Sequence, residues 1–457
     1  LAMAQLWPLK TWSSPYERAV YQGQKLADWD RDHVWHSFTQ MKHYTPFVVA
    51  AAEGARIIDV DGNEYIDAVS SLWCNVHGHR HPMLDAALKQ QVDRVAHVTN
   101  LGGSNDQTIQ LARLLAELTP GDLKHVFFCS DGANSIEVAL KMAFQYWQQR
   151  HHPEPQRVKY VCLSDAYHGD TIGTVSLGDI PLFHKIFKPL LFEPIRVPAP
   201  DAFEPSVPES STGGLDDGLK NLELVLQQHS GEIAAIVAEP LVQGAAGIKI
   251  HPEGYLKGVA DLAKRYDVLL IADEVAVGFG RTGTLFACEQ ESVEPDILCL
   301  GKGLSGGYLP ISAAVVTPKI YEAFWGDYSE RKTLYHGHTF AGNPLACAVS
   351  IANLQVFEKE KTLENLVPKI SRMAERLERL NQSDLAEKTR QKGMMAAFDL
   401  KVPAGKNETE YGYYFCELVQ QYGVRMRPLG KTIIVMPPLS ITLDELDVIF
   451  DAIDMVL

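Results

Sequence analysis

The sequence predicts an α/β fold built around a mostly parallel β-sheet. From about Cys74 onward, short apolar runs rich in β-branched residues alternate with segments of helical periodicity, which is the pattern of repeated strand–helix–strand units. The apolar runs are nearly continuous rather than alternating, which indicates strands covered by helices on both faces. A chain of 457 residues, 46% of them hydrophobic, is long enough for one large domain and a second, smaller one.

Six apolar runs are predicted as strands of this sheet, in chain order residues 125–131, 159–165, 233–239, 268–273, 296–302 and 311–318. The first run leads into a segment with helical spacing of apolar residues, including Ile136, Leu140 and Ala143, which predicts a long helix. Residues 197–218 are rich in proline, serine, glycine and acidic residues, so we expect a surface excursion from the large domain there.

The pattern changes after about Ile351. Two helical patterns flank the apolar runs at 393–400 and 432–439, which predicts a separate small α/β domain. We therefore expect three parts: residues 1–70 as an N-terminal segment that joins the small domain, residues 71–350 as the large domain, and residues 351–457 as the C-terminal small domain.

Composition narrows the class of partners. The chain has 42 Lys and Arg against 57 Asp and Glu, a net charge of -15, and no basic run interleaved with aromatic residues, so the sequence does not predict nucleic-acid binding. It shows no uninterrupted apolar stretch of the ~18 residues that a membrane-spanning helix needs. Seven scattered cysteines without a C-x-x-C pair are typical of reduced residues in the cytoplasm. We expect a cytoplasmic protein that binds small molecules.

Ligands of parallel α/β sheets bind outside the carboxyl ends of the strands, and four of the predicted strand ends carry unusual residues. At the first, Gly132 permits a tight turn directly before a helix, so the N–H groups of Gly132, Ala133 and Asn134 could hold a phosphate. An ordinary capped turn is the alternative. At the second, Tyr167 could stack on a planar ligand, or it could be a half-buried tyrosine beside a hydrogen-bonded His168.

The other two strand ends place charge next to apolar runs. Asp273 follows the run at 268–271, and a carboxylate there needs a partner, either a protonated ring nitrogen of a ligand or the guanidinium of Arg281 or Arg265. Lys302 stands between two glycines after another apolar run. Burial would lower the pKa of its amine toward the range of a nucleophile or base, and the glycines let a ligand approach closely.

One cofactor explains these four features together. Pyridoxal phosphate requires an amine for a Schiff base, an acid that keeps its pyridine nitrogen protonated, a partner for the face of its ring and an anion site for its phosphate. Lys302, Asp273, Tyr167 and the turn at Gly132 can supply them. The sequence therefore predicts a pyridoxal-phosphate site at the carboxyl edge of the sheet.

Two further motifs resemble a known family. The stretch "IADEVAVGFGRTG" (271–283), followed by "DILCLGKGLSGGYLP" (296–310), is similar to class III aminotransferases of fold type I, which use pyridoxal phosphate. The resemblance runs from about Val34 to the C-terminus. It implies a large domain with a mostly parallel seven-stranded sheet between helices, and a small α/β domain formed by the N- and C-terminal segments.

The resemblance implies a role for each site residue. Lys302 forms the Schiff base and moves the proton during transamination, Asp273 binds the pyridine nitrogen, and Tyr167 stacks on the ring. Gly132 and Ala133 hold the phosphate.

The resemblance also implies a homodimer with shared active sites, because Thr339 reaches the phosphate of the other subunit. Glu239 and Gln243 support the site. The residues that it implies as substrate contacts are Phe38, Trp73, Arg281, Gly337, His338 and Arg427. Among them, Arg427 is the one that binds the substrate carboxylate.

Within the family, stretches at 34–41, 70–82, 166–178, 336–348 and 427–439 are similar to the group that aminates 8-amino-7-oxononanoate in biotin biosynthesis. The implied partners are this keto acid and an amino donor, with 7,8-diaminononanoate as product. The donor stays open between S-adenosylmethionine and lysine, and Phe38, Trp73 and His338 are more similar to lysine-using members. Alternative hypotheses are a class III aminotransferase for an ω-amino acid or diamine, an aminomutase or decarboxylase of this fold, and a catalytically silent binding module.

The closely spaced His77, His79 and His81 could suggest a metal site. No acid or cysteine accompanies them on a helix, so we expect a hydrogen-bonded loop and no metal.

Overall fold

A seven-stranded sheet forms the centre of the larger part of the molecule. The computed structural model describes residues 23–202 and 215–457, so most of the predicted surface excursion at 197–218 lies outside the described residues. The strand order is β4-β12-β11-β10-β7-β5-β6. The strands are β4 (His125–Cys129), β5 (Lys159–Leu163), β6 (Ile195–Val197), β7 (Ile233–Ala238), β10 (Leu269–Asp273), β11 (Ile297–Leu300) and β12 (Ser312–Val316).

The six predicted strands are confirmed, and the sheet is mostly parallel. Strand β10 pairs in parallel with both β7 and β11, and β5 pairs in parallel with β6 and β7. Strand β12 runs antiparallel to its two neighbours, β11 and β4. The sequence predicts neither this reversal nor the edge strand β6, which is only three residues long.

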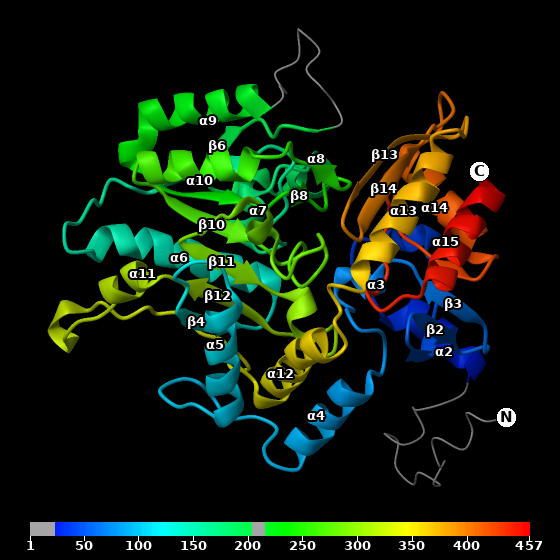
Figure 1. Ribbon diagram of the computed structural model, residues 1–457, viewed down its shortest axis with the longest axis horizontal. Coiled ribbons are helices and arrows are strands. Elements are labelled where there is room, and N and C mark those ends of the chain that lie inside the picture. The colour runs from blue at the N-terminus through cyan, green and yellow to red at the C-terminus, as the bar shows by residue number, and fades with distance from the viewer. Residues whose placement is uncertain (1–22, 203–214) are drawn as a thin grey trace.

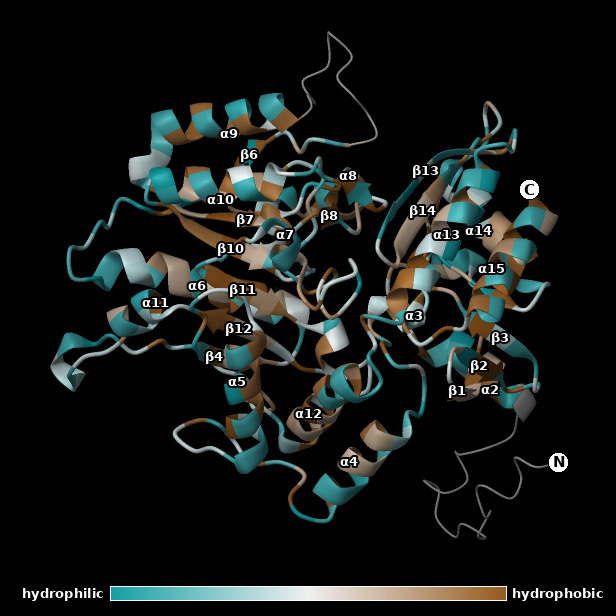
Figure 2. Cartoon of the chain, in the orientation of Figure 1, coloured by the Kyte–Doolittle hydropathy of each residue, from teal (hydrophilic) through white to brown (hydrophobic). Residues whose placement is uncertain are grey.

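Helices cover both faces of this sheet (Figure 1). In β10, Leu269 and Ile271 belong to the core cluster that contains Ile136 of α6 (Gly132–Gln149). Leu270 and Ala272, which lie on the opposite face of the strand, belong to a second core cluster that contains residues of α10 (Tyr255–Arg265). Figure 2 shows the central strands as apolar and the surrounding helices as a mixture of polar and apolar residues. Burial on both faces explains why the strand sequences are continuously apolar.

Several helices complete the larger part: α4 (Pro82–Val92), α5 (Asp106–Leu118), α7 (Ile172–Leu177), α8 (Pro181–His184), α9 (Leu215–His229), α11 (Pro318–Ala323) and α12 (Pro344–Lys359). In the part of the chain that the structure describes, no helix is both long and apolar enough to cross a membrane.

The smaller part combines both ends of the chain. Its first sheet joins β1 (Val49–Glu53), β2 (Arg56–Asp59) and β3 (Glu64–Asp67) to β15 (Val424–Arg425), and its second contains β13 (Ala386–Lys392), β14 (Met395–Leu400), β16 (Pro428–Leu429) and β17 (Thr432–Val435). Its helices are α2 (Gly23–His33), α13 (Leu366–Leu380), α14 (Glu408–Gln420) and α15 (Leu443–Val456). We propose the domain limits at residues 70 and 350 that the sequence predicts, with α12 spanning the second.

Candidate active site

The four strand ends singled out in the sequence meet at one edge of the sheet. A β-carbon built on Gly132 would lie 2.5 Å from Val275 Cγ1, and one built on Gly301 would lie 3.2 Å from the same atom and 3.4 Å from Gly132 Cα. A β-carbon on Gly169 would overlap Ala133. The turns that follow β4, β5, β10 and β11 are therefore in contact, and these glycines are the reason they can approach so closely.

Lys302 lies in this cluster, at the start of a short 3-10 helix (Lys302–Ser305), with a left-handed φ of 42°. Desolvation lowers the pKa of its amine, whereas the carboxylates of Asp273 and Glu239 act in the opposite direction. Its Nζ lies 4.8 Å from the centroid of the Trp73 ring. Strained backbone at a partly desolvated amine is typical of a functional lysine.

Asp273 ends β10 and is buried. Its Oδ2 is 2.7 Å from His168 Nδ1, and its Oδ1 accepts the N–H of Val275 at 3.0 Å. Burial alone would lower the pKa of His168, but the hydrogen bond and charge of Asp273 outweigh it and raise the pKa. Asp273 and His168 therefore form a buried, hydrogen-bonded pair, and neither Arg281 nor Arg265 is the partner of this carboxylate.

The turn before α6 is only partly as predicted. Asp131, the N-cap residue, accepts the N–H of Asn134 at 3.1 Å, so the expectation that this amide is free is wrong. An Asp cap is favourable because it takes up one of the unpaired N–H groups at a helix start. Among the residues that the structure describes, the amides of Gly132 and Ala133 have no acceptor. Two N–H groups at the positive end of the helix dipole remain for an anion.

Tyr167 follows β5 and is half-buried. Its hydroxyl donates to Asp170 at 2.7 Å, and burial raises the pKa of the phenol well above its ordinary value. Its amide donates to Glu239, which also accepts the N–H of Gly244 at 2.9 Å. Burial, together with the nearby charge of Asp273, raises the pKa of Glu239 to about 7. Glu239 thus holds the turn that presents Tyr167.

Two aromatic residues next to Tyr167 carry no signal in the sequence. Phe183 of α8 packs edge-on against Phe38, with ring centroids 5.1 Å apart, and also lies near Tyr167. His184 is parallel to the Tyr167 ring, at 6.1 Å between centroids. Phe183 therefore connects the predicted substrate wall at Phe38 to the predicted cofactor partner Tyr167.

Arg281 is fully buried and its donors are largely occupied. Nη1 donates to the carbonyl of Pro437, and Nη2 donates to Ser70 Oγ and to the carbonyl of Asn75. Desolvation lowers the pKa of its guanidinium to about 10. The structure shows Arg281 as a link between the smaller part and the turn at Ser70, and its role as a substrate contact stays a prediction.

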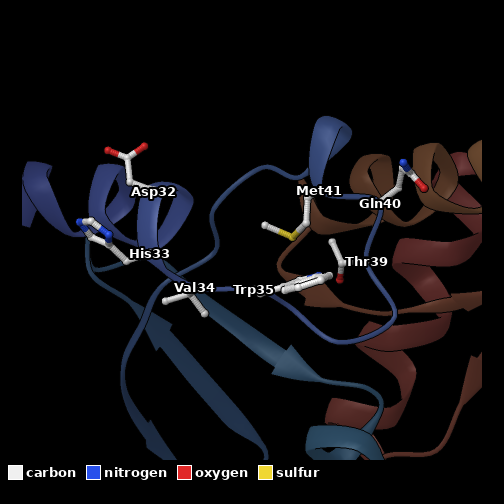
Figure 3. Close-up of a pocket in the computed structure, with 7 residues that line it drawn as sticks. All are labelled: Asp32, His33, Val34, Trp35, Thr39, Gln40 and Met41. Carbon is white, nitrogen blue, oxygen red and sulfur yellow. The ribbon is translucent and has the colours of Figure 1, made fainter.

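Arg427 and Phe38 are in contact. Arg427 Nη2 donates to the carbonyl of Phe38 at 2.9 Å, and Phe38 has a left-handed φ of 50°. Among the described residues, the remaining guanidinium nitrogens of Arg427 have no acceptor. The loop that carries Phe38 also borders a cavity of about 570 Å³ (Figure 3), which is lined by Asp32, His33, Val34, Trp35, Thr39, Gln40 and Met41 and does not include Lys302 or Asp273.

The predicted residues Gly337, His338 and Thr339 lie in the segment that leads to α12. Gly337 and Thr339 are exposed, and the His338 ring is 5.0 Å from that of His336. The same segment is held on α6, where Lys141 donates to the carbonyl of Tyr335 at 2.8 Å. Large aromatic side chains stay exposed there, Tyr335 at 78% and Phe340 at 64%.

The three histidines at 77, 79 and 81 have three separate partners. His77 bonds to the carbonyl of Asn353, His79 to Asp67, and His81 to Glu360. Burial lowers the pKa of His77 to about 3, so this ring is neutral.

Glu274, next to Asp273, has a different task. It is fully buried and accepts the N–H groups of Ala287 and Cys288 at 2.7 and 2.8 Å. Burial raises the pKa of Glu274 from 4.5 to about 7, so between these pH values the folded protein holds a proton that the unfolded chain has lost. This group makes stability fall as pH rises through that range.

Substituting Glu274 tests this linkage. Glutamine does not titrate, so the variant Glu274→Gln lacks this pH dependence. When the pH rises from 4.5 to 7, the free energy of unfolding of the wild type should therefore fall by about 3 kcal/mol relative to that of the variant. Urea unfolding of both proteins at the two pH values measures the difference. An unchanged difference would show that Glu274 does not titrate in this range.

Comparison with known proteins agrees with this geometry. The family model of class-III aminotransferases matches residues 38–457. The chain belongs to the class-III aminotransferase family. A relative from Geobacter sulfurreducens, named adenosylmethionine-8-amino-7-oxononanoate aminotransferase, is 46% identical over 95% of this chain and 97% of its own length. A relative of the same name from Nitratidesulfovibrio vulgaris is 47% identical over 94% of this chain and 81% of its own.

Solved structures of class-III aminotransferases share the whole fold. The crystal structure of adenosylmethionine-8-amino-7-oxononanoate aminotransferase from Methanocaldococcus jannaschii matches with a TM-score of 0.87 and 40% identity, over 95% of this chain and 99% of that one. An (S)-enantioselective omega-transaminase from Thermomicrobium roseum matches with a TM-score of 0.88 and 32% identity, over 96% of this chain and 98% of that one.

Class-III aminotransferases use pyridoxal phosphate, and the residues at this sheet edge fit it. The cluster offers a desolvated amine at Lys302, a buried carboxylate at Asp273 and two free amides at the start of α6. Buried His168 Nε2 and Gln243 Oε1 have no partner among the described residues, so polar groups remain for a ligand. An amine, an acid and an anion site in one cluster are what this cofactor requires.

Proposed function

We propose that this class-III aminotransferase transfers an amino group to 8-amino-7-oxononanoate, giving 7,8-diaminononanoate, a step of biotin biosynthesis. The observation that carries the proposal is the shared name of relatives that are 46% and 47% identical over nearly the whole chain. Purified protein assayed with 8-amino-7-oxononanoate, and in parallel with pyruvate and short keto acids, tests it. Preference for pyruvate would contradict the proposal.

In this proposal the roles of the chain's residues follow from their surroundings. Pyridoxal phosphate, when bound, supplies the carbonyl that takes up nitrogen and a ring that withdraws electrons. The amine of Lys302 binds the cofactor and carries a proton to and from the substrate carbon. Asp273, hydrogen-bonded to His168, holds a proton on the ring nitrogen. Tyr167 covers the ring, and the amides of Gly132 and Ala133 bind the phosphate.

Arg427 is the proposed carboxylate partner of the keto acid. The carbonyl of Phe38 accepts a hydrogen bond from Nη2 of Arg427. The other nitrogens of the guanidinium can therefore form charge-assisted hydrogen bonds with the substrate carboxylate. Arg427→Ala should therefore raise the KM for 8-amino-7-oxononanoate about tenfold or more and change the KM for the donor much less. Steady-state kinetics with each substrate varied in turn measures both. Equal effects on the two KM values would place the carboxylate elsewhere.

The amino donor in this proposal is S-adenosylmethionine or lysine. The names of the relatives contain adenosylmethionine, whereas Phe38, Trp73 and His338 are more similar to lysine-using members of the family. Mixing the holoenzyme with each donor alone and following the visible absorbance of the cofactor identifies the donor, because only a true donor removes that band.

We also propose a homodimer in the cytoplasm. Thr339 lies in an exposed segment next to exposed aromatic residues, as expected of a surface that a second subunit covers. All seven cysteines are free, as expected in a reducing compartment. If Thr339 binds the cofactor phosphate in the active site of the other subunit, a mixed dimer can test this. A dimer of one Lys302→Ala subunit and one Thr339→Ala subunit should then bind cofactor at one site, because one site lacks both side chains and the other keeps both. Size-exclusion chromatography with light scattering tests the dimer itself.

An ω-amino-acid transaminase is the second candidate, because a solved omega-transaminase shares the fold at 32% identity. High activity with ω-amino acids or diamines, without amination of 8-amino-7-oxononanoate, would favour it.

A further inference from the structure

A short left-handed turn, α3 (Ser70–Trp73), lies between the two parts of the molecule (Figure 1). Its four residues have φ values of 44°, 51°, 70° and 69°, and none of them is glycine. The backbone closes in this turn, where Trp73 N donates to the carbonyl of Val69 at 2.8 Å. Left-handed conformation costs roughly 1–2 kcal/mol per residue, so other contacts must hold the turn.

Two sets of contacts hold it. The first residue, Ser70, is buried and donates to the carbonyl of Met436 at 2.7 Å while accepting from Arg281. The second residue, Ser71, donates its hydroxyl to Asp67 Oδ2 at 2.8 Å. Ser71 is exposed, so Asp67 is its anchor to the fold.

Asp67 is itself fixed firmly. It ends β3, is 2% exposed, and its Oδ2 lies 3.1 Å from His79 Nε2. Burial would raise the pKa of Asp67, but the hydrogen bonds from His79 and Ser71 outweigh it and lower the pKa. Asp67 is therefore a charged acceptor shared by the turn and the loop at His79.

The turn ends in Trp73, whose side chain is 7% exposed and lies beside the amine of Lys302. On another side the indole meets Gly244, where an added β-carbon would lie 3.1 Å from Trp73 Cζ3. The space between the ring and Gly244 is too small for a methyl group, and the backbone of the turn sets the place of the ring relative to Lys302.

We propose that Asp67 is a positioning residue which, through its bond to Ser71, holds the left-handed turn and so keeps the Trp73 indole against the Lys302 amine. Asp67 does not touch the reacting atoms. The inference rests on the proposed function only in taking Lys302 as the residue that binds the cofactor. It adds a specific consequence: loss of the bond at Ser71, with a residue other than glycine at that position, uncovers one side of the lysine–cofactor linkage.

The test uses the holoenzyme without substrates. The rate at which cyanoborohydride reduces the linkage between Lys302 and the cofactor reports how well the linkage is covered, and the visible circular dichroism of the cofactor reports its orientation. Asp67→Ala and Ser71→Ala should raise the reduction rate about tenfold, as loss of one hydrogen bond of about 1.4 kcal/mol predicts. Trp73→Ala gives the rate for a site without the indole, and the two variants should approach it.

Glycine provides the decisive matched variant. Ser71→Gly also lacks the hydroxyl, but glycine adopts positive φ without strain, so its rate and dichroism should stay near those of the wild type. Glu360→Ala removes a neighbouring carboxylate that bonds to His81 and not to the turn, and it should change neither signal.

Three outcomes would overturn the inference: wild-type rates in both Ser71→Ala and Asp67→Ala, equal rates in Ser71→Gly and Ser71→Ala, or an increase in Glu360→Ala equal to that in Asp67→Ala. If Asp67→Ala does not fold, the two Ser71 variants still decide. A wild-type protein with no reducible linkage at Lys302 would contradict the proposed function instead.

Discussion

Lys302→Ala should abolish transamination, lowering kcat by at least about 10⁴-fold, while the protein stays folded. The amine of Lys302 is the group that the cluster at the sheet edge surrounds, and its loss removes both the attachment of the cofactor and the proton carrier. The side chain makes no hydrogen bond or ion pair with other described residues, so removal should leave the fold intact. Activity assays and thermal unfolding of the purified variant measure both effects.

Lys369→Ala is the matched control for that experiment. Burial lowers the pKa of Lys369 as it does that of Lys302, and its amine donates to the carbonyl of Leu439 at 2.6 Å. Lys369 lies on α13, in the smaller part of the molecule. We expect a modest loss of stability and normal turnover. Normal turnover by Lys302→Ala, or equal losses in the two variants, would contradict the assignment of the reactive amine.

Asp273→Ala should lower kcat by about 10³-fold and weaken cofactor binding much less. The carboxylate of Asp273 is the buried acid of the cluster, and without it no group holds the proton on the ring nitrogen. Lys302 and the amides of Gly132 and Ala133 at the start of α6 remain to bind the cofactor. Asp273→Asn keeps the volume and loses the charge, so it should show the same fall in kcat. Stopped-flow measurement of one half-reaction, with cofactor titration in parallel, separates the two effects.

Glu274→Gln is the control for charge at this strand end. Both carboxylates are buried, but that of Glu274 accepts the N–H groups of Ala287 and Cys288, which lie outside the cluster around Lys302. The variant should keep its kcat within about threefold, because the substitution changes bonds to the amides of Ala287 and Cys288 and leaves the Asp273 carboxylate in place. An equal fall in kcat in the variants of both residues would mean that Asp273 has no special role.

Much of the site could be predicted because its residues follow strands. Parallel strands bring their carboxyl ends to one edge, so Gly132, Tyr167, Asp273 and Lys302 needed no knowledge of long-range contacts to be grouped. The apolar runs predicted the strands because helices bury both faces of the sheet.

The remaining features depend on contacts between distant residues. The left-handed conformation of Ser70 to Trp73 depends partly on Arg281 and on the carbonyl of Met436, which both lie over 200 positions further along the chain, so the neighbouring sequence does not mark it. The cap of the Asn134 amide is an exception, because Asp131 is only three positions away and an Asp directly before a helix is a common N-cap residue, so the sequence could have predicted it. The antiparallel direction of β12 also has no signature in its composition.

Arg281 illustrates how a motif can suggest an ion pair, here with Asp273, that the structure does not form. An arginine in a glycine-rich turn next to an acid is compatible with an ion pair or a ligand contact. In the structure its guanidinium instead donates to two carbonyls and a serine hydroxyl, which ties together the two parts of the molecule. The backbone acceptors that decide this are far apart in the sequence.

The central claim is that the amine of Lys302 binds pyridoxal phosphate at the carboxyl edge of the sheet. Borohydride reduction of the holoenzyme, followed by peptide mass spectrometry, tests it directly. The account predicts one phosphopyridoxyl group per chain, on Lys302. A group on another lysine, or no modified lysine at all, would contradict it.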